Sequence, residues 1–275
     1  GLPYAEPFTL LSYRFVITLF FLLILIIYKK SPWPETRLDF FHLLIAGVLI
    51  HGVYLGGVFQ ALKWGMPAGL GAMVIGLQPI GMALVAGVLL KEEVSKKQWT
   101  GLIMGLVGLY LVLFDSLDLT EQIAFDGFPI WAVFAVIISL FAISIGTIYQ
   151  KRFCSNMNLY SGAWVQYFSA SILCILIVLF FENGEVSWSR TFILAMTWQV
   201  LGLSIGAILL LMTMIKKDAL ASVGSYFYLV APLVAIQAWF LFEETIGLSA
   251  LAGVVLISFG VAITTSKKSI RNLQS

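Results

Sequence analysis

The sequence predicts an all-α polytopic membrane protein, and three observations support this prediction. Of the 275 residues, 60% are hydrophobic and 11% are charged, whereas about 25% are charged in an ordinary soluble domain. The apolar residues gather into stretches of about 20, the length that a helix needs to cross roughly 30 Å of hydrocarbon. The alternation of apolar and polar residues that is typical of an outer-membrane barrel is absent from the sequence. A soluble globule and a barrel are therefore excluded.

Nine apolar stretches follow one another along the chain, and each is a predicted membrane-spanning helix. Short connections join them, so successive helices cross the membrane in opposite directions. In chain order they are Pro7 to Tyr28, Leu38 to Leu62, Ala68 to Leu90, Gln98 to Phe114, Phe128 to Gln150, Asn158 to Phe181, Thr191 to Ile215, Ala219 to Phe242 and Gly247 to Thr265.

The basic residues of the connections fall almost entirely on one side. If the first span runs inward, 13 Lys and Arg residues lie on one side and only Lys63 and Arg190 on the other. An excess of Lys and Arg in short loops marks the cytoplasmic side, so the C-terminus is predicted to be cytoplasmic. The eight acids of the opposite side, Glu182 among them, are interpreted as solvated loop charge. The net charge of +2 is too small to indicate a nucleic-acid partner.

The two halves of the chain repeat each other. A shift of 152 positions places Arg14 on Gln166 and Glu92 on Glu244, and around Pro79 the shift becomes 153. By the loop charges, Glu92 lies inside and Glu244 outside, so the halves have opposite topology. This is the inverted-repeat plan of secondary transporters.

The repeat also divides the chain into predicted parts. Residues 1–115 form the first repeat, residues 127–266 form the second repeat, and residues 267–275 form a cytoplasmic tail. The span 128–150 has no partner under the shift, because its counterpart precedes residue 1. We therefore expect one further helix before the present start, which gives two inverted five-helix repeats and ten helices in all.

Polar side chains in the middle of a span are candidates for function, because burying them in lipid costs several kcal/mol unless they are paired or line a wet cavity. His51 lies at the middle of its span, and Tyr54 follows three positions later on the same helical face. We interpret the pair as part of a substrate pocket. A local hydrogen bond between the two side chains is the alternative.

Two prolines occupy corresponding positions in the third and eighth spans. Pro79 follows Gln78, and Pro232 follows a group of polar residues. Those residues are Ser225, Tyr226 and Tyr228. Proline removes a backbone donor, and paired discontinuities in two repeats point to a transporter's binding site. Structural kinks are the alternative.

Other residues in the spans are given predicted roles from their position in the helix. Trp164 is predicted to add to the substrate site, whereas Gln166 is either a cavity residue or a structural one. Arg14 lies about 10 Å from the outer end of its span, close enough to extend outward, and we interpret it as a structural anchor. Glycines at helical spacing predict close helix packing. They are Gly101, Gly108, Gly253 and Gly260.

Motifs for other chemistry are absent from the sequence. There is no His-Glu-x-x-His zinc motif, no Gly-x-Ser-x-Gly elbow and no phosphate-binding loop, so we predict no metal, no cofactor and no enzymatic activity. Cys154 lies in a loop and Cys174 is deep in the following span. About 24 Å of helix separates them, too far for a disulfide, so both are predicted to be free thiols.

A set of short motifs occurs in order along the chain and then again in the second half. The first half carries Pro7-x6-Arg14, Ala61-Leu62-Lys63 before Pro67-Ala68-Gly69-Leu70-Gly71-Ala72, Leu77-Gln78-Pro79 followed by Glu92, and Gly101-x6-Gly108. The second half carries Ala221-Ser222, Ala231-Pro232, Glu244 and Gly253-x6-Gly260. In this order the chain resembles the bacterial drug/metabolite transporter (DMT) superfamily, EamA type.

The resemblance implies two inverted five-helix halves and a central cavity lined by helices three, four, eight and nine. These numbers count the expected helix before residue 1 as helix one, so the four helices are the second, third, seventh and eighth spans of this chain. Here those helices carry His51 and Tyr54, Gln78, Ser204 and Thr213, and Ser225 to Tyr228. It also implies export of amino acids and related metabolites.

We therefore predict a multi-pass bacterial inner-membrane exporter of small amphipathic metabolites, amino acids among them, that works by alternating access. Its predicted partners are a small-molecule substrate and the lipid bilayer. Multidrug efflux is one alternative, and a non-transporting scaffold or lipid-carrier subunit is another.

Overall fold

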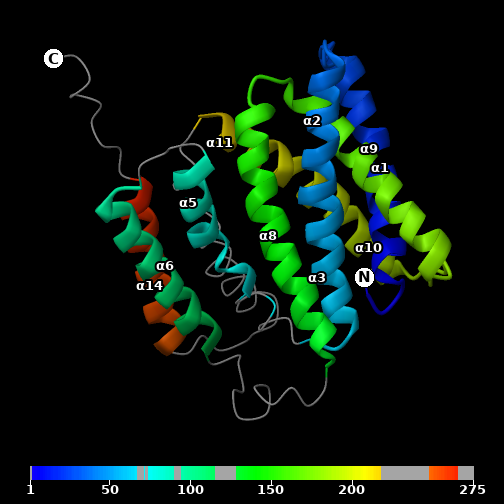
Figure 1. Ribbon diagram of the computed structural model, residues 1–275. Helices are drawn as coiled ribbons and strands as arrows, with labels where there is room; N and C mark the ends of the chain where they lie inside the picture. Colours follow the sequence, from blue (N-terminus) through cyan, green and yellow to red (C-terminus); the bar gives the residue numbers. More distant parts are fainter. Residues whose placement is uncertain are drawn as a thin grey trace. The chain divides into compact units, whose positions relative to one another are not determined.

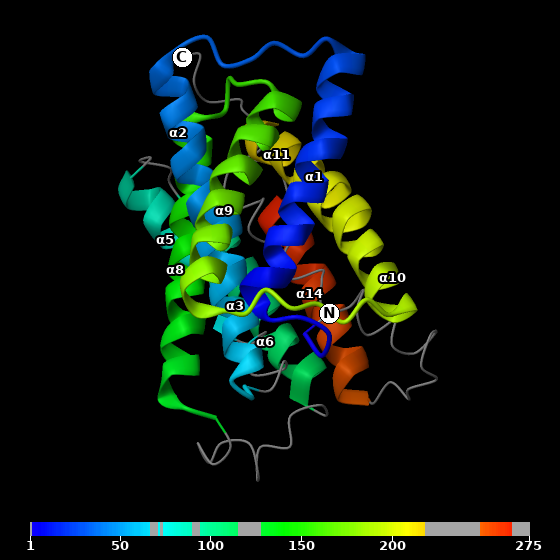
Figure 2. The ribbon, with the colours of Figure 1, turned by 90° about the vertical axis from the view of Figure 1, so that its right-hand side faces the viewer.

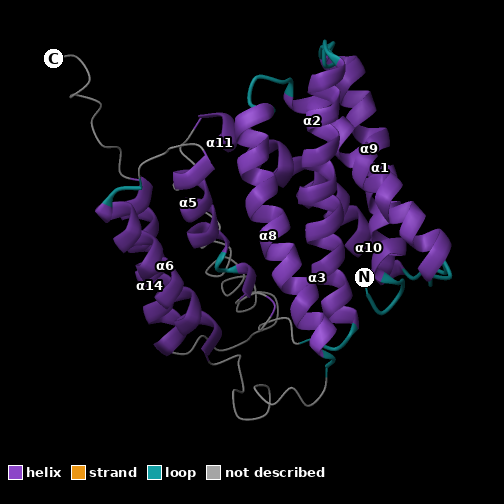
Figure 3. Ribbon diagram, in the orientation of Figure 1, coloured by secondary structure: helices purple, strands orange, loops and turns teal. Residues whose placement is uncertain are grey.

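The computed structural model describes residues 2–66, 71, 74–89, 94–114, 128–217 and 248–265. Within these residues the chain is helical, and its extended backbone is limited to one isolated bridge between Ala5 and Val186 (Figure 3). The helices are α1 (Pro7–Lys29), α2 (Arg37–Gly47), η1 (Val48–Val53), α3 (Tyr54–Lys63), α5 (Gln78–Leu89), α6 (Lys96–Phe114), α8 (Ile130–Phe153), α9 (Leu159–Phe181), α10 (Arg190–Trp198), η2 (Gln199–Ala207), α11 (Ile208–Lys217) and α14 (Leu248–Thr265). The predicted all-α class is confirmed.

Local sequence signals begin several of these helices. Pro7 starts α1, where its fixed φ angle suits the first turn and its missing N–H is not needed. Thr36 and Asp39 form a capping box at the start of α2, in which each side chain bonds the other residue's backbone N–H. Asn158 caps α9, and Ser189 caps α10 through the Phe192 amide. Each cap satisfies donors that the first helical turn leaves open.

The chain forms two compact units, and each is described by itself. The first unit comprises Gly1–Gly71 and Phe125–Asp218, and the second comprises Ala72–Ala124 and Ala219–Ser275. In the first unit α1 packs against α9, and α3 packs against α8, while α2 touches both α8 and α9 (Figure 1). The segment η2 lies against α1.

The outer surface of the first unit is apolar. Five helical stretches of the described chain are long and apolar enough to cross a membrane, and all five belong to this unit: Pro7–Lys29, Arg37–Lys63, Ile130–Phe153, Leu159–Phe181 and Arg190–Met214. Large apolar side chains point outward from them, for example Tyr28 at 77% and Phe181 at 82% exposure. Such surface is stable only against lipid. The protein is a multi-pass membrane protein.

The start of α1 is joined to the end of α9 near the N-terminus. The Glu182 carboxylate accepts hydrogen bonds from the Phe8 amide at 2.9 Å, the Thr9 amide at 2.6 Å and the Thr9 hydroxyl at 2.7 Å. The neighbouring chain segments lie side by side there (Figure 2), with the Ser187 amide bonded to the Tyr4 carbonyl at 2.8 Å. Glu182 is therefore no ordinary solvated loop charge, because it caps α1 from another helix.

In the second unit, α6 and α14 pack along their length. A Cβ atom at Gly101 would overlap the Thr264 hydroxyl and the Gly260 carbonyl, and one at Gly108 would overlap the Gly253 carbonyl. Glycine at these positions lets the two backbones meet directly.

The helix before α5 is interrupted in the same unit. Residues 76–77 form a turn and α5 begins at Gln78, with Pro79 in its first turn.

Candidate functional site

Two long helices of the first unit carry a π-helical segment near their middle. The helix of residues 37–63 contains η1, and the helix of residues 190–217 contains η2. A π-helix bonds residue i to residue i+5 and is found often at functional sites. His51 lies in η1 and Ser204 lies in η2.

The η1 segment approaches α9 closely because small residues flank His51. A Cβ atom at Gly47 would overlap the Gln166 backbone, and one at Gly52 would lie 2.7 Å from the Leu173 side chain. The Ser169 hydroxyl ties the same helices together by donating to the Leu44 carbonyl at 2.9 Å. This close approach sets His51 against α9.

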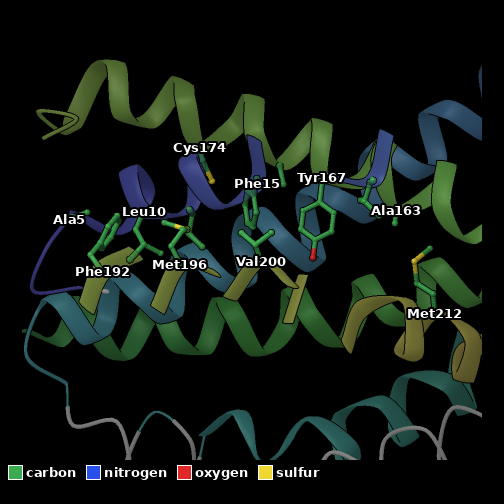
Figure 4. Packing of buried hydrophobic residues seen from close by; sticks show 13 residues of the cluster. Ala5, Leu10, Phe15, Ala163, Tyr167, Cys174, Phe192, Met196, Val200 and Met212 are labelled. Atoms are coloured by element: carbon green, nitrogen blue, oxygen red, sulfur yellow. The ribbon is translucent and has the colours of Figure 1, made fainter. Parts of the chain in front are cut away.

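Aromatic rings enclose His51. Its imidazole stacks on the Tyr167 ring, with centroids 4.2 Å apart and planes 19° apart. The Phe15 ring of α1 meets the imidazole edge-on at 6.3 Å and lies 5.4 Å from Tyr167. Figure 4 shows Phe15 and Tyr167 in the core of this unit, among Leu10, Met196 and Val200.

Arg14 is buried beside these rings, with 4% of its surface exposed. Its Nε donates to the Ser204 hydroxyl at 2.8 Å, and the Tyr167 hydroxyl donates to the Ser204 carbonyl at 3.0 Å. The guanidinium carbon lies 5.9 Å from the centre of the Phe15 ring. Arg14 therefore does not extend outward, as its depth in the span would allow: its side chain turns into the helix bundle and bonds the Ser204 hydroxyl.

Several polar atoms at this place lack hydrogen-bond partners within the described part of the chain. They include His51 Nε2 and both the Nε2 and Oε1 atoms of Gln166. The Gln166 side chain lies next to His51, but no hydrogen bond of good geometry joins them. Buried polar groups of native proteins are almost always bonded, so each exception needs an explanation.

The internal repeat relates these residues in pairs. The shift of 152 that superposes the bounds of α1 on those of α9 places Arg14 on Gln166 and Phe15 on Tyr167. The shift of 153 that superposes the start of α2 on that of α10 places His51 on Ser204. The contact of Arg14 with Ser204 and the approach of Gln166 to His51 are thus the same helix-to-helix relation made twice. We call these six residues the paired cluster.

The structure places the other predicted site residues as follows. Tyr54 starts α3, directly after η1, and lies near the Arg14 guanidinium, so it belongs beside the paired cluster. No hydrogen bond joins His51 to Tyr54 among those found in the described chain. Trp164 belongs to a separate aromatic group, in which it stacks on Phe168 at 5.3 Å and meets Trp33 edge-on.

The remaining predicted substrate-site residues lie in the second unit or outside the described residues. Gln78 is buried in the second unit, where its amide donates to the Met82 sulfur at 3.5 Å. Four predicted residues lie outside the described residues: Ser225, Tyr226, Tyr228 and Pro232.

Sequence reasoning missed Tyr167 as a site residue. The signal was present in the repeat, because Tyr167 is adjacent to Gln166, the counterpart of Arg14. The chemistry of the cluster is polar and aromatic. No group of three or more His, Cys, Asp or Glu residues suited to a metal occurs within the described ranges.

A helical membrane protein that buries polar groups where two inverted repeats meet has the architecture of a secondary transporter. The sequence matches the EamA-like transporter family over residues 1–114 and 130–266. The chain belongs to this family.

Individual relatives are distant. The "Uncharacterized inner membrane transporter YedA" of Escherichia coli (strain K12) is 24% identical over 96% of this chain and 81% of its own length. The "Probable amino-acid metabolite efflux pump" of Salmonella typhimurium is 26% identical over 55% of this chain and 46% of its own length. For some of the curated relatives, the chain thus spans about half of their length. A solved crystal structure with 19% identity and a TM-score of 0.78 covers 95% of this chain and 89% of its own, which shows the shared fold.

Proposed function

We propose that the protein is a bacterial inner-membrane secondary transporter that exports small amphipathic metabolites, amino acids among them, by alternating access between its repeats. The observation that carries this proposal is the paired cluster. It buries unpaired polar atoms of His51 and Gln166 within a membrane-spanning bundle, and the repeat counterparts of these two residues, Ser204 and Arg14, make the matching contact. Such groups mark substrate pathways.

Further observations agree with the proposal. Aromatic rings beside the polar atoms suit a solute with an apolar part and a polar part. A relative from Salmonella typhimurium is named as a probable amino-acid metabolite efflux pump. The loop charges, 13 basic residues against two, favour a cytoplasmic C-terminus.

A counterflow experiment tests the proposal on the full-length protein. Proteoliposomes are loaded with one unlabelled amino acid at a time, and uptake of the same labelled amino acid is measured. We expect exchange for at least one amino acid. Absence of exchange for all twenty would contradict the proposed substrate class, and exchange of lipophilic dyes instead would favour multidrug efflux.

Replacement of His51 by Ala tests the site. We expect H51A to reduce counterflow to the background rate, because it removes the ring stacked on Tyr167 and the polar atom next to Gln166. The matched control is H42A, since His42 is the other of the chain's 2 histidines and bonds Tyr149 at 2.6 Å outside the paired cluster. Size-exclusion profiles check folding. Normal exchange by H51A would remove the paired cluster from the pathway.

A further inference from the structure

We propose that Arg14 is an anion-binding residue, which takes the carboxylate of the transported solute with Gln166 and His51 beside it. The inference rests on the proposed function, because it names the chemical group that this site recognises. It replaces the structural role that the sequence suggested for Arg14.

The first step is the charge of Arg14. A guanidinium stays protonated in proteins, and a buried ion costs several kcal/mol unless an opposite charge and hydrogen bonds compensate it. Only 4% of the Arg14 surface is exposed, and no acidic side chain bonds Arg14 within the described residues. In the sequence every acid lies in a connection or at the end of an apolar stretch. An anion from outside the chain is the compensation that fits.

The second step is the orientation of the guanidinium. Ser204 accepts from Nε at 2.8 Å, and the Ser204 backbone is itself held by the Tyr167 hydroxyl at 3.0 Å. This bond fixes the plane of the side chain and leaves its two Nη atoms without a hydrogen bond to any described residue. Two parallel N–H groups of arginine match the two oxygens of a carboxylate.

The third step is the set of neighbouring donors. The Gln166 amide and His51 Nε2 are buried and unpaired, and both groups can donate a hydrogen bond to an oxygen. Gln166 and His51 are 0% and 1% exposed. A purely structural link between α1 and η2 explains the bond from Arg14 to Ser204, but it leaves the polar atoms of Gln166 and His51 without hydrogen-bond partners. A bound carboxylate would accept hydrogen bonds from the Gln166 Nε2 and His51 Nε2 donors.

The fourth step is the rest of the ligand. Phe15 and Tyr167 lie within 6.3 Å of the His51 ring centre, so the surroundings of the polar groups are aromatic. Rings of this kind favour an apolar or cationic group next to the carboxylate. The ligand class is therefore an amphipathic monocarboxylate, which includes amino acids.

The test compares acids with their amides on the purified full-length protein. Each amino acid and its carboxamide, and benzoate and benzamide, are added separately while thermal unfolding is followed. We expect stabilisation by at least one acid and none by its amide. If no carboxylate stabilises the wild type, or if acid and amide stabilise equally, the proposal is overturned. This arm needs no variant.

Variants then assign the effect to Arg14. R14K keeps the charge but loses the bidentate geometry of the guanidinium. We expect R14K to bind the acid that stabilises the wild type at least about tenfold more weakly, because one charge-assisted hydrogen bond is lost. R14M removes the charge and should abolish the effect. R190Q, which changes an exposed arginine at the start of α10, is the control and should bind like the wild type. Wild-type affinity in R14K and R14M would overturn the proposal.

The outcomes separate this inference from the proposed function. Acid-specific, Arg14-dependent stabilisation without any amino-acid counterflow would support the anion site and contradict transport of amino acids. Counterflow that accepts amides as well as acids, and persists in R14M, would support transport and overturn the anion site.

Discussion

Some hydroxyl side chains inside the membrane-spanning helices bond their own helix, whereas His51 Nε2 and the Gln166 amide have no partner among the described residues. Thr18, Ser139 and Thr147 donate to the carbonyl four residues earlier in their own helix, at 2.7 to 2.8 Å. Such a bond satisfies the hydroxyl locally and leaves nothing for a ligand. The longer side chains of His51 and Gln166 make no such bond to the carbonyl four residues earlier. His51 and Gln166 therefore carry the argument for function.

A residue-scale prediction concerns the two thiols, which are free as the sequence indicated. Burial, together with the nearby charge of Asp39, raises the pKa of Cys154 to about 12. Because the thiolate is the reactive form, we expect no maleimide labelling of the folded protein at pH 7 over an hour, and complete labelling in denaturing detergent. Cys174, buried in α9, should behave alike. Rapid labelling of either thiol in the folded protein would contradict this.

The same shift sets a stability limit at high pH. The pKa of Cys154 is higher in the folded state than the ordinary value of 9.0, so the folded state holds the proton more tightly. Its contribution to stability is complete below pH 9 and is lost as pH rises towards 12. A Cys154→Ser variant should lose less stability over that range, and this difference can be measured by thermal unfolding.

At the residue scale the sequence could show how deep a side chain lies, but not where it points. Arg14 was placed about 10 Å inside its helix, and that depth allows either an outward or an inward conformation. The direction depends on Ser204, which is 190 positions away. His51 was found because its polarity stands out in an apolar helix. Tyr167 was missed because a tyrosine is unremarkable there until its neighbours are known.

At the scale of elements, hydropathy predicted most helices of the described residues closely, because the membrane sets both their length and their composition. The predicted span Ala219 to Phe242 lies outside the described residues. The predicted span Asn158 to Phe181 is α9 (Leu159–Phe181), with Asn158 as its cap. The π-helical segments were not predicted, because a pattern of period 3.6 assumes a regular helix. This is why His51 and Tyr54 were expected on one face of a single helix. In the structure His51 belongs to η1 and Tyr54 to α3.

An element-scale prediction concerns the cap that joins α9 to α1. Replacing Glu182 by Ala removes three hydrogen bonds to the first turn of α1, and loss of an N-terminal cap costs about 0.5 to 2 kcal/mol. We expect E182A to unfold at a temperature lower by a few degrees. E185A, at an exposed position of the same connection, is the control and should leave the unfolding temperature within error. Equal effects of the two substitutions would show that the cap adds no stability.

For the whole molecule, the inverted repeat explains why unlike residues occupy equivalent places. Symmetry gives the helices the same approach twice, once between Arg14 and Ser204 and once between Gln166 and His51. The side chains differ, because one contact contains the Arg14 guanidinium and the other contains an amide and an imidazole. A repeat of this kind could be read from the sequence, whereas the convergence of its pairs required the helix packing.

The last prediction concerns the energy that drives transport. Proton-driven carriers commonly use an ionisable group inside the membrane that binds and releases a proton during the cycle. All 14 acids of this chain lie in connections or at the ends of apolar stretches, and His51 is the only central side chain that ordinarily titrates near neutral pH. We therefore expect either facilitated diffusion down the solute gradient or proton coupling through His51 alone.

Counterflow by the wild type should then be as fast without a proton gradient as with one. It is measured with equal pH on both sides and a protonophore present. The reason is that exchange of solute for solute needs no net proton movement. Net uptake driven by an imposed pH gradient distinguishes the two branches. It should be absent under facilitated diffusion. Under coupling through His51 it should be present in the wild type and lost in H51N, while the counterflow that H51N retains shows that the loss is one of coupling. The control H42N should follow the wild type in both measurements. Gradient-driven uptake that persists in H51N would contradict both branches, since the proton would then use another group.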